Sequence, residues 1–124
     1  MKVKYALIFD ALVLLVVAVG CFFDMTWVHN MLGIYHAPDY VFFCQLLGAA
    51  VFGLALQNWL VRKIEDLEKL HIILLANFVA HGAAFLIILA NKLNGSGDVT
   101  AWLAVGYTLL ATLLFGYFLD RPRL

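Results

Sequence analysis

The chain has 124 residues, of which 65% are hydrophobic, and its formal net charge is zero. Soluble domains use about 45–50% apolar residues, and a domain this small has too little interior to bury the excess. In water the surplus would form large apolar patches and drive aggregation. Composition therefore excludes a water-soluble domain and predicts an integral membrane protein.

Four apolar stretches follow one another at about 5–27, 40–61, 70–91 and 100–119. Each is near the ~20 residues that a helix needs to cross ~30 Å of hydrocarbon. The short connections leave no room for a soluble domain or a long linker. We predict an all-α fold, a single transmembrane domain over 1–124 arranged as an up-down-up-down four-helix bundle.

The first stretch also has features of a secretory leader, since Lys2 and Lys4 precede an apolar core and Cys21 ends a poor lipoprotein-like processing site. Asp10 interrupts that core, which is unusual for a leader. We therefore expect a retained membrane helix, with cleavage as the alternative.

Asp10 lies at membrane depth, almost two turns inside Lys4. Its side chain is too short to reach the headgroups, and burying it costs free energy unless a partner compensates. We expect a protonated structural aspartate, with a proton-handling one as the alternative. Asp10 shares an inward stripe with Val17, Cys21 and Asp24. Its expected partners are Gln57, Thr112 and Tyr117.

The connection 29–39 is too apolar for a solvated loop, so we expect it to lie against the membrane surface. Asp39, directly after Pro38, is predicted to cap the second helix. His29, His36 and Asp39 could form a shallow metal site, but their spacing matches no standard motif. We predict neither a metal nor a cofactor.

The second stretch carries Cys44, which an antiparallel arrangement could bring near Cys21. We expect both to be small apolar side chains, with a disulfide as the alternative. Small and polar residues at four-residue spacing mark helix–helix seams in membranes. The predicted seams are Gln45, Ala49, Gly53 and Gln57; Ala76, Ala80 and Ala84; and Ala104, Thr108, Thr112 and Gly116.

The basic residues are distributed unevenly. Of the 8 Lys and Arg residues, Lys92 alone lies beside the first or third connection. The positive-inside rule then places both termini and the connection 62–69 in the cytoplasm, in a multi-pass protein of the cell (inner) membrane. The mixed charges of that connection suit a solvated turn and argue against nucleic-acid binding.

The third stretch contains Asn77 and His81, four residues apart and therefore on one helix face. Asn77 could orient the imidazole, and Ala80 and Ala84 leave space beside it for an incoming group. We expect an interhelical hydrogen-bonding histidine, with a ligand-binding or proton-handling one as the alternative. Haem is not expected, because no second histidine lies at matching depth.

Near the stretch ends, Trp27, Trp59 and Trp102 are expected to anchor the helices at the interface. The cluster 94–98 predicts a turn in which glycine supplies positive φ.

Four segments together resemble small uncharacterised bacterial four-helix membrane proteins of the domain-of-unknown-function type. They are Ala37-Pro38-Asp39, Gln45-Leu46-Leu47-Gly48-Ala49, Trp59-Leu60-Val61-Arg62 and His81. Gln45 departs from that pattern, in which an arginine is expected. The resemblance implies a fold and a membrane location, and no activity.

Usual catalytic motifs are missing from the sequence, which makes an enzyme the less favoured class. The first functional hypothesis is an accessory or scaffolding subunit of a larger membrane assembly, or a homo-oligomer, with membrane lipids and other membrane subunits as partners. The second is a small carrier, channel or hydrophobic-ligand-binding protein that uses Asp10, Asn77 and His81. The third is an intramembrane enzyme acting on a lipid or quinone-like substrate. Gln45 is a further candidate site residue.

Overall fold

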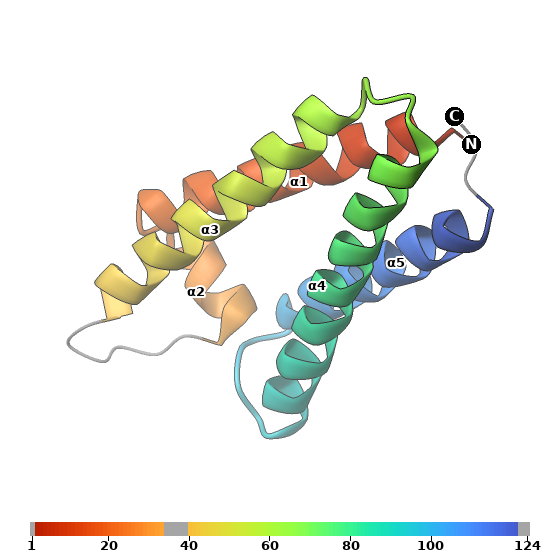
Figure 1. The fold of residues 1–124 in the computed structure, drawn as a ribbon. Coiled ribbons are helices and arrows are strands. Elements are labelled where there is room, and N and C mark those ends of the chain that lie inside the picture. Colours follow the sequence, from red (N-terminus) through yellow and green to blue (C-terminus); the bar gives the residue numbers. More distant parts are fainter. Residues whose placement is uncertain (1, 34–39, 122–124) are drawn as a thin grey trace.

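The computed structural model describes residues 2–33 and 40–121 (Figure 1). This part of the chain forms five α-helices: α1 (Val3–Phe22), α2 (Thr26–Leu32), α3 (Tyr40–Val61), α4 (Leu67–Leu93) and α5 (Ala101–Asp120). All except α2 are long and apolar enough to cross a membrane. The all-α class is thereby confirmed, as is the prediction of four helices long and apolar enough to span a membrane.

The predicted first span, 5–27, was wrong at its end, because α1 stops at Phe22 and the short helix α2 follows. Asp24 adopts a left-handed φ of 53°. The amide of Met25 donates to the Gly20 carbonyl at 2.9 Å, and that of Asp24 donates to Cys21 at 3.4 Å. This is the Schellman pattern of a helix C-terminus. Aspartate tolerates the left-handed region that the pattern needs, and glycine, the usual signal, is absent at that position.

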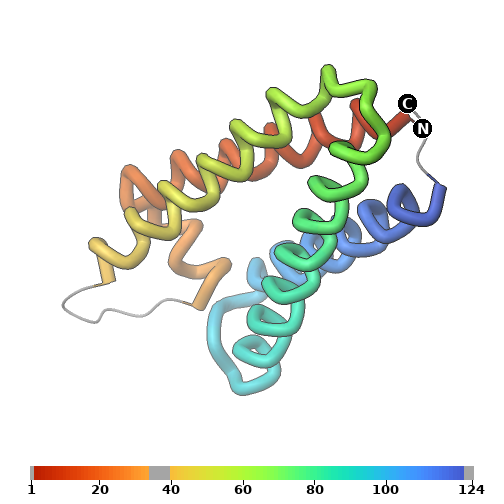
Figure 2. Tube along the Cα trace, in the orientation of Figure 1, coloured from red at the N-terminus to blue at the C-terminus, as the bar shows by residue number. Residues whose placement is uncertain are grey.

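The long helices pack as two pairs, α1 with α3 and α4 with α5. Figures 1 and 2 show the pairs diverging from the end where α3 connects to α4. At that end the start of α1, the end of α3, the start of α4 and the end of α5 share one apolar cluster. It contains Val3, Ala6, Leu7, Val61, Leu70, Leu74, Ala111, Phe115 and Phe118.

The predicted seam on α3 was wrong. Gln45, Ala49 and Gly53 are exposed, and the buried face carries Cys44, Gly48, Ala55, Asn58 and Val61. A Cβ added at Gly48 would lie 2.9 Å from the Cys21 Cβ and 3.2 Å from the Ala18 carbonyl oxygen. Gly48 therefore allows the close approach of α1 and α3. Both faces of α3 carry small residues, so spacing alone could not choose between them.

The other predicted seams had mixed outcomes. On α5, Ala104 and Thr108 are buried and Thr112 and Gly116 are half-buried, as predicted. On α4, Ala76 is exposed, which corrects the predicted seam at that residue, and Ala80 and Ala84 are half-buried. The buried residues of α4 are instead Leu70, Leu74, Asn77 and His81.

The connections are held by local hydrogen bonds. The Asp66 carboxylate accepts from the Glu68 and Lys69 amides at 3.1 and 3.3 Å, so α4 begins three residues before the predicted 70. In the turn before α5, Gly95 and Gly97 have φ of 87° and 74°, as predicted.

Candidate functional site

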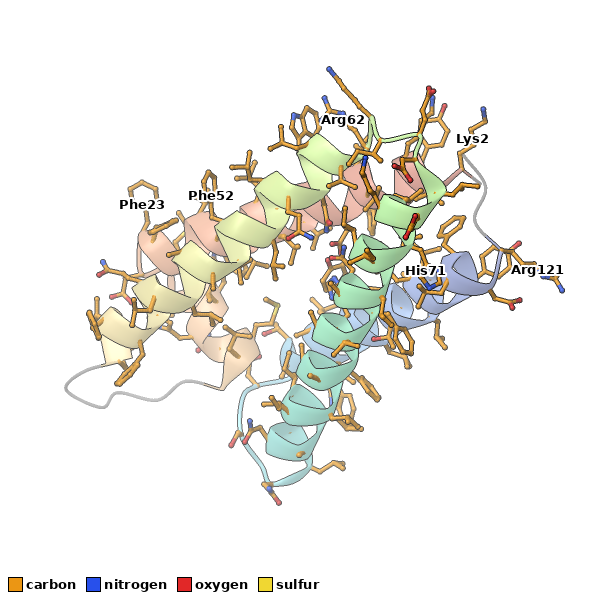
Figure 3. All side chains as sticks on the ribbon, in the orientation of Figure 1. Lys2, Phe23, Phe52, Arg62, His71 and Arg121 are labelled. Carbon is orange, nitrogen blue, oxygen red and sulfur yellow. The ribbon has the colours of Figure 1, made fainter. Side chains whose placement is uncertain are left out.

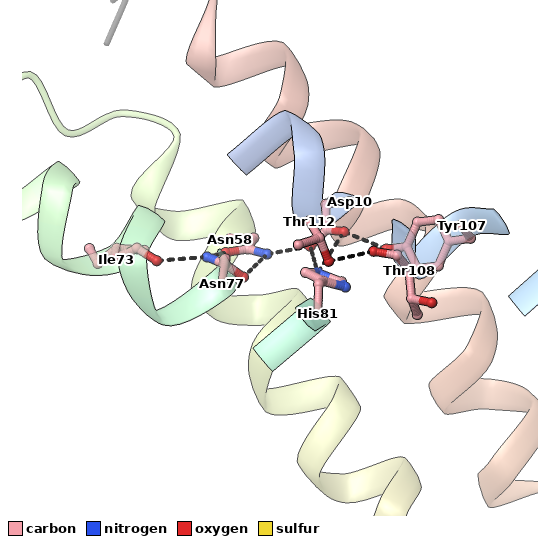
Figure 4. Close-up of polar contacts among 8 residues, drawn as sticks. All are labelled: Asp10, Asn58, Ile73, Asn77, His81, Tyr107, Thr108 and Thr112. Atoms are coloured by element: carbon pink, nitrogen blue, oxygen red, sulfur yellow. Dashed lines mark hydrogen bonds and ion pairs between the residues drawn. The ribbon is translucent and has the colours of Figure 1, made fainter. Parts of the chain in front are cut away.

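The Asp10 side chain is the centre of a polar cluster that joins all four long helices (Figure 4). Asn58 Nδ2 of α3 donates to Asp10 Oδ2 at 2.6 Å. His81 Nε2 of α4 lies 3.1 and 3.2 Å from the two carboxyl oxygens. The Tyr107 hydroxyl of α5 donates to Oδ1. Because Asp10 is only 2% exposed, these contacts supply the compensation that a carboxyl at membrane depth requires.

Asn58 and Asn77 form a reciprocal pair of buried amides. Asn58 Nδ2 donates to Asn77 Oδ1 at 3.0 Å, and Asn77 Nδ2 donates back to Asn58 Oδ1 at 2.8 Å. The second Asn77 proton goes to the Ile73 carbonyl at 3.0 Å. Both amides therefore use both of their N–H protons. Asn58 is consequently fixed as a donor to Asp10.

His81 is held from three sides. Its ring stacks on Phe115 with centroids 5.6 Å apart and meets the edge of Tyr107 at 5.7 Å. Nε2 is occupied by Asp10, and Figure 4 shows the other ring nitrogen, Nδ1, directed away from the carboxyl. Among residues 2–33 and 40–121, no side chain or backbone group hydrogen-bonds to Nδ1. One ring nitrogen of His81 therefore has no hydrogen-bond partner within the part of the chain that the structure describes.

A cavity of about 550 Å³ borders His81, and all five helices line it, largely with apolar side chains. The lining residues that carry polar side-chain groups are Trp27, His81, Tyr107 and Thr108. Thr108 Oγ1 already donates within α5, to Ala104 and Val105. The cavity is therefore open and mostly apolar, with a few polar groups on its wall, as is usual for a small-molecule site.

The Asp10 cluster lies between this cavity and the apolar cluster at the closed end of the molecule, which is the end where α3 connects to α4. Along α1, Leu7 comes before Asp10 and Leu14 comes after it. Along α4, Leu74 comes before Asn77 and His81, and Ala84 comes after them. Along α5, read from its C-terminal end, Phe115 and Ala111 come before Tyr107, and Ala104 comes after it. On each helix the first residues named pack at the closed end and the last lines the cavity. The polar groups therefore form one layer across the bundle.

The predicted site residues are only partly brought together. Asp10, Asn77 and His81 share the cluster, although Asn77 reaches His81 through Asn58 and Asp10. Gln45 lies exposed on α3, away from it. The expected partners of Asp10 were wrong: Gln57 and Thr112 are half-buried outside the cluster, and Tyr117 is 46% exposed.

Asn58 and Tyr107 were missed as site residues. Asn58 lies one residue nearer the end of α3 than Gln57, so the available signal was an amide side chain at membrane depth. Tyr107 lies almost two turns inside its helix, away from the interface where tyrosine is usual. That position could have singled it out.

A second polar group lies at the C-terminal end of α1. His29 Nε2 is 2.8 Å from Asp24 Oδ1, and the Tyr40 hydroxyl donates to Asp24 Oδ2 at 3.3 Å. Asp24 is thus paired within the protein. The suggested metal site with His36 and Asp39 falls outside the described residues, as does the Asp39 cap; the described residues contain no group of three metal-binding side chains.

Cys21 and Cys44 are free and buried, and they share a small cluster with Val28 of α2.

Comparisons with protein-family models, curated proteins and solved structures find no match to this chain.

Proposed function

We propose that this protein binds an apolar small molecule, such as a lipid or a quinone-like compound, in the cavity beside His81. The observation that carries the proposal is that His81, whose Nδ1 has no hydrogen-bond partner among the described residues, lines an apolar cavity of about 550 Å³. A long hydrocarbon tail suits the apolar walls, and a polar head suits the imidazole. The hydrogen bond to Asp10 orients the ring for that contact, as second partners of histidine ligands do.

The number of protons that the Asp10–His81 pair can hold supports a role for this pair in recognising the polar head group of the bound molecule. The contact between the carboxyl and Nε2 holds one proton. With that proton alone, Nδ1 is an acceptor for a hydroxyl group; a second proton makes Nδ1 a donor for a carbonyl oxygen. The same nitrogen can therefore meet either kind of head group.

The proposed membrane arrangement is up-down-up-down, with both termini and the connection between α3 and α4 in the cytoplasm of a bacterial inner-membrane protein. The shared apolar cluster supports it, because the start of α1, the end of α3, the start of α4 and the end of α5 meet there. Lys2, Lys4, Arg62 and Lys63 lie at this same end, on the side that the positive-inside rule assigns to the cytoplasm.

The test is co-purification with a matched pair of variants. Ala84 lines the cavity, whereas its neighbour Ala83 is exposed on the outside of α4. The protein would be extracted in mild detergent, and mass spectrometry would quantify the small molecules that remain bound. Wild type and Ala83→Phe should retain the same apolar molecule, and Ala84→Phe should lose most of it. Equal retention by both variants, or only bulk lipid in wild type, would refute the proposal.

A second candidate function is that of a subunit, in a homo-oligomer or a larger assembly. One observation favours it: Gln45, Ala49 and Gly53 form an exposed face of α3, and nothing lies within 4 Å of a Cβ added at Gly53. Small residues at this spacing permit close helix contact, and a partner could satisfy the glutamine amide. Gly53→Leu should reduce the native mass to that of the monomer, whereas Gly106→Leu, equally open on α5, should not. A monomeric wild type would exclude self-association.

A further inference from the structure

A second cavity, of about 510 Å³, opens at the end of the molecule where α1 begins and α3 ends. Its inner wall is apolar and includes Val3, Leu7 and Val61 of the closed-end cluster. Four cationic side chains also line it: Lys2, Lys4, Arg62 and Lys63. Figure 3 shows Lys2 and Arg62 at this end of the molecule.

These four cations have no carboxylate partner in residues 2–33 and 40–121, although other basic residues at the same end do. Lys69 pairs with Asp66 at 2.9 Å, and Arg121 with Asp120 at 3.4 Å. Glu65 is the one acidic residue in the lining, and it forms no ion pair within those ranges. The lining therefore carries four cationic side chains and one anionic side chain, and none of them forms an ion pair within the described chain.

One of the cations is already oriented. The Arg62 guanidinium lies 3.7 Å from the centre of the Trp59 ring and donates to the Trp59 carbonyl. A stacked guanidinium loses less conformational entropy when it binds an anion. Trp59 is 42% exposed at a helix end, where membrane tryptophans mark the headgroup level. The cationic rim is therefore at the depth of lipid phosphates.

We propose that this cavity binds a phosphate anion, supplied by the headgroup of an anionic phospholipid. Arg62 and the lysines donate charge-assisted hydrogen bonds to the phosphoryl oxygens. The accessible apolar side chains of the lining, Tyr5, Ile8 and Ile64, receive the start of an acyl chain, which free phosphate lacks. This inference concerns the opposite end of the bundle from the cavity beside His81 and does not rest on its function.

The experiment titrates the full chain, in a neutral detergent, with short-chain phosphatidylglycerol, short-chain phosphatidylcholine and inorganic phosphate, and reads binding by native mass spectrometry. Wild type should bind phosphatidylglycerol well above the other two. Lys2→Gln/Lys63→Gln should weaken that binding about 30-fold, since each basic residue contributes a factor of about five at an anionic surface. Lys69→Gln/Arg121→Gln, with the same change in charge, is the control.

Three results would overturn the assignment. Equal losses in the two double variants would indicate diffuse attraction without a site, and equal binding of phosphatidylcholine would remove the need for an anion. Phosphate that binds as tightly as phosphatidylglycerol would reject the lipid as the source of the anion. All four substituted side chains are solvent-facing, and the unfolding midpoint of each variant, measured beside its binding, separates loss of the site from loss of stability.

Discussion

Asn58 offers the sharpest test of the polar layer, because sequence reasoning overlooked it in favour of its neighbour Gln57. The Asn58 amide is fully buried and makes three hydrogen bonds to other helices, one with Asp10 and two with Asn77. Asn58→Ala removes all three. It leaves a carboxyl and an amide at membrane depth with fewer partners.

The expected magnitude follows from these contacts. Hydrogen bonds between membrane helices contribute about 0.6 kcal/mol on average, so three of them amount to about 2 kcal/mol. The groups left unpaired raise the cost towards about 4 kcal/mol, since a buried unsatisfied group costs about 1–3 kcal/mol. Gln57→Ala, which changes a half-buried amide outside the cluster, should stay within about 0.5 kcal/mol of wild type.

The assay is reversible unfolding in mixed micelles with increasing denaturing detergent, followed by helical circular dichroism. A double-mutant cycle with Asn77→Ala should give a coupling of about 1 kcal/mol, because the two amides share two hydrogen bonds. Destabilisation by Gln57→Ala equal to that by Asn58→Ala, or no coupling to Asn77, would refute the polar layer described above.

Two further predictions concern packing and pH. Gly48→Ala should destabilise the protein by about 1–3 kcal/mol, because the added Cβ would press on α1. Gly53→Ala should leave the stability almost unchanged, because nothing lies within 4 Å of a Cβ there. Equal unfolding midpoints for the two variants would contradict the α1–α3 contact. The side-chain contact with Lys69 and the amides of the first turn of α4 lower the pKa of Asp66. Its ionised form therefore stabilises the fold above the pKa of an unfolded aspartate, about 3.9, and that contribution is lost as the pH falls below this value. Asp66→Asn should remove this part of the pH dependence of the unfolding midpoint between pH 7 and 3; an unchanged profile would contradict it.

The architecture could be predicted because it depends on quantities that local sequence carries. The length of each apolar run fixes whether it can cross the hydrocarbon, and the bounds of α3 matched 40–61. The turn at Gly95 and Gly97 followed from the positive φ that glycine permits. The helix break between α1 and α2 was harder to predict, because Asp24 occupies the left-handed position where glycine is usual.

The sequence by itself determined that the chain has four helices long and apolar enough to cross a membrane, and that Asp10, Asn77 and His81 lie within these apolar segments. Only the tertiary structure decided which face of α3 packs, that Asn58 and Tyr107 complete the Asp10 cluster, and that a cavity lies beside His81. The physical reason is that burial in lipid depends on the composition of a whole segment. A hydrogen bond depends on the rotation and relative depth of two helices, and several rotations satisfy the same pattern of small and apolar residues.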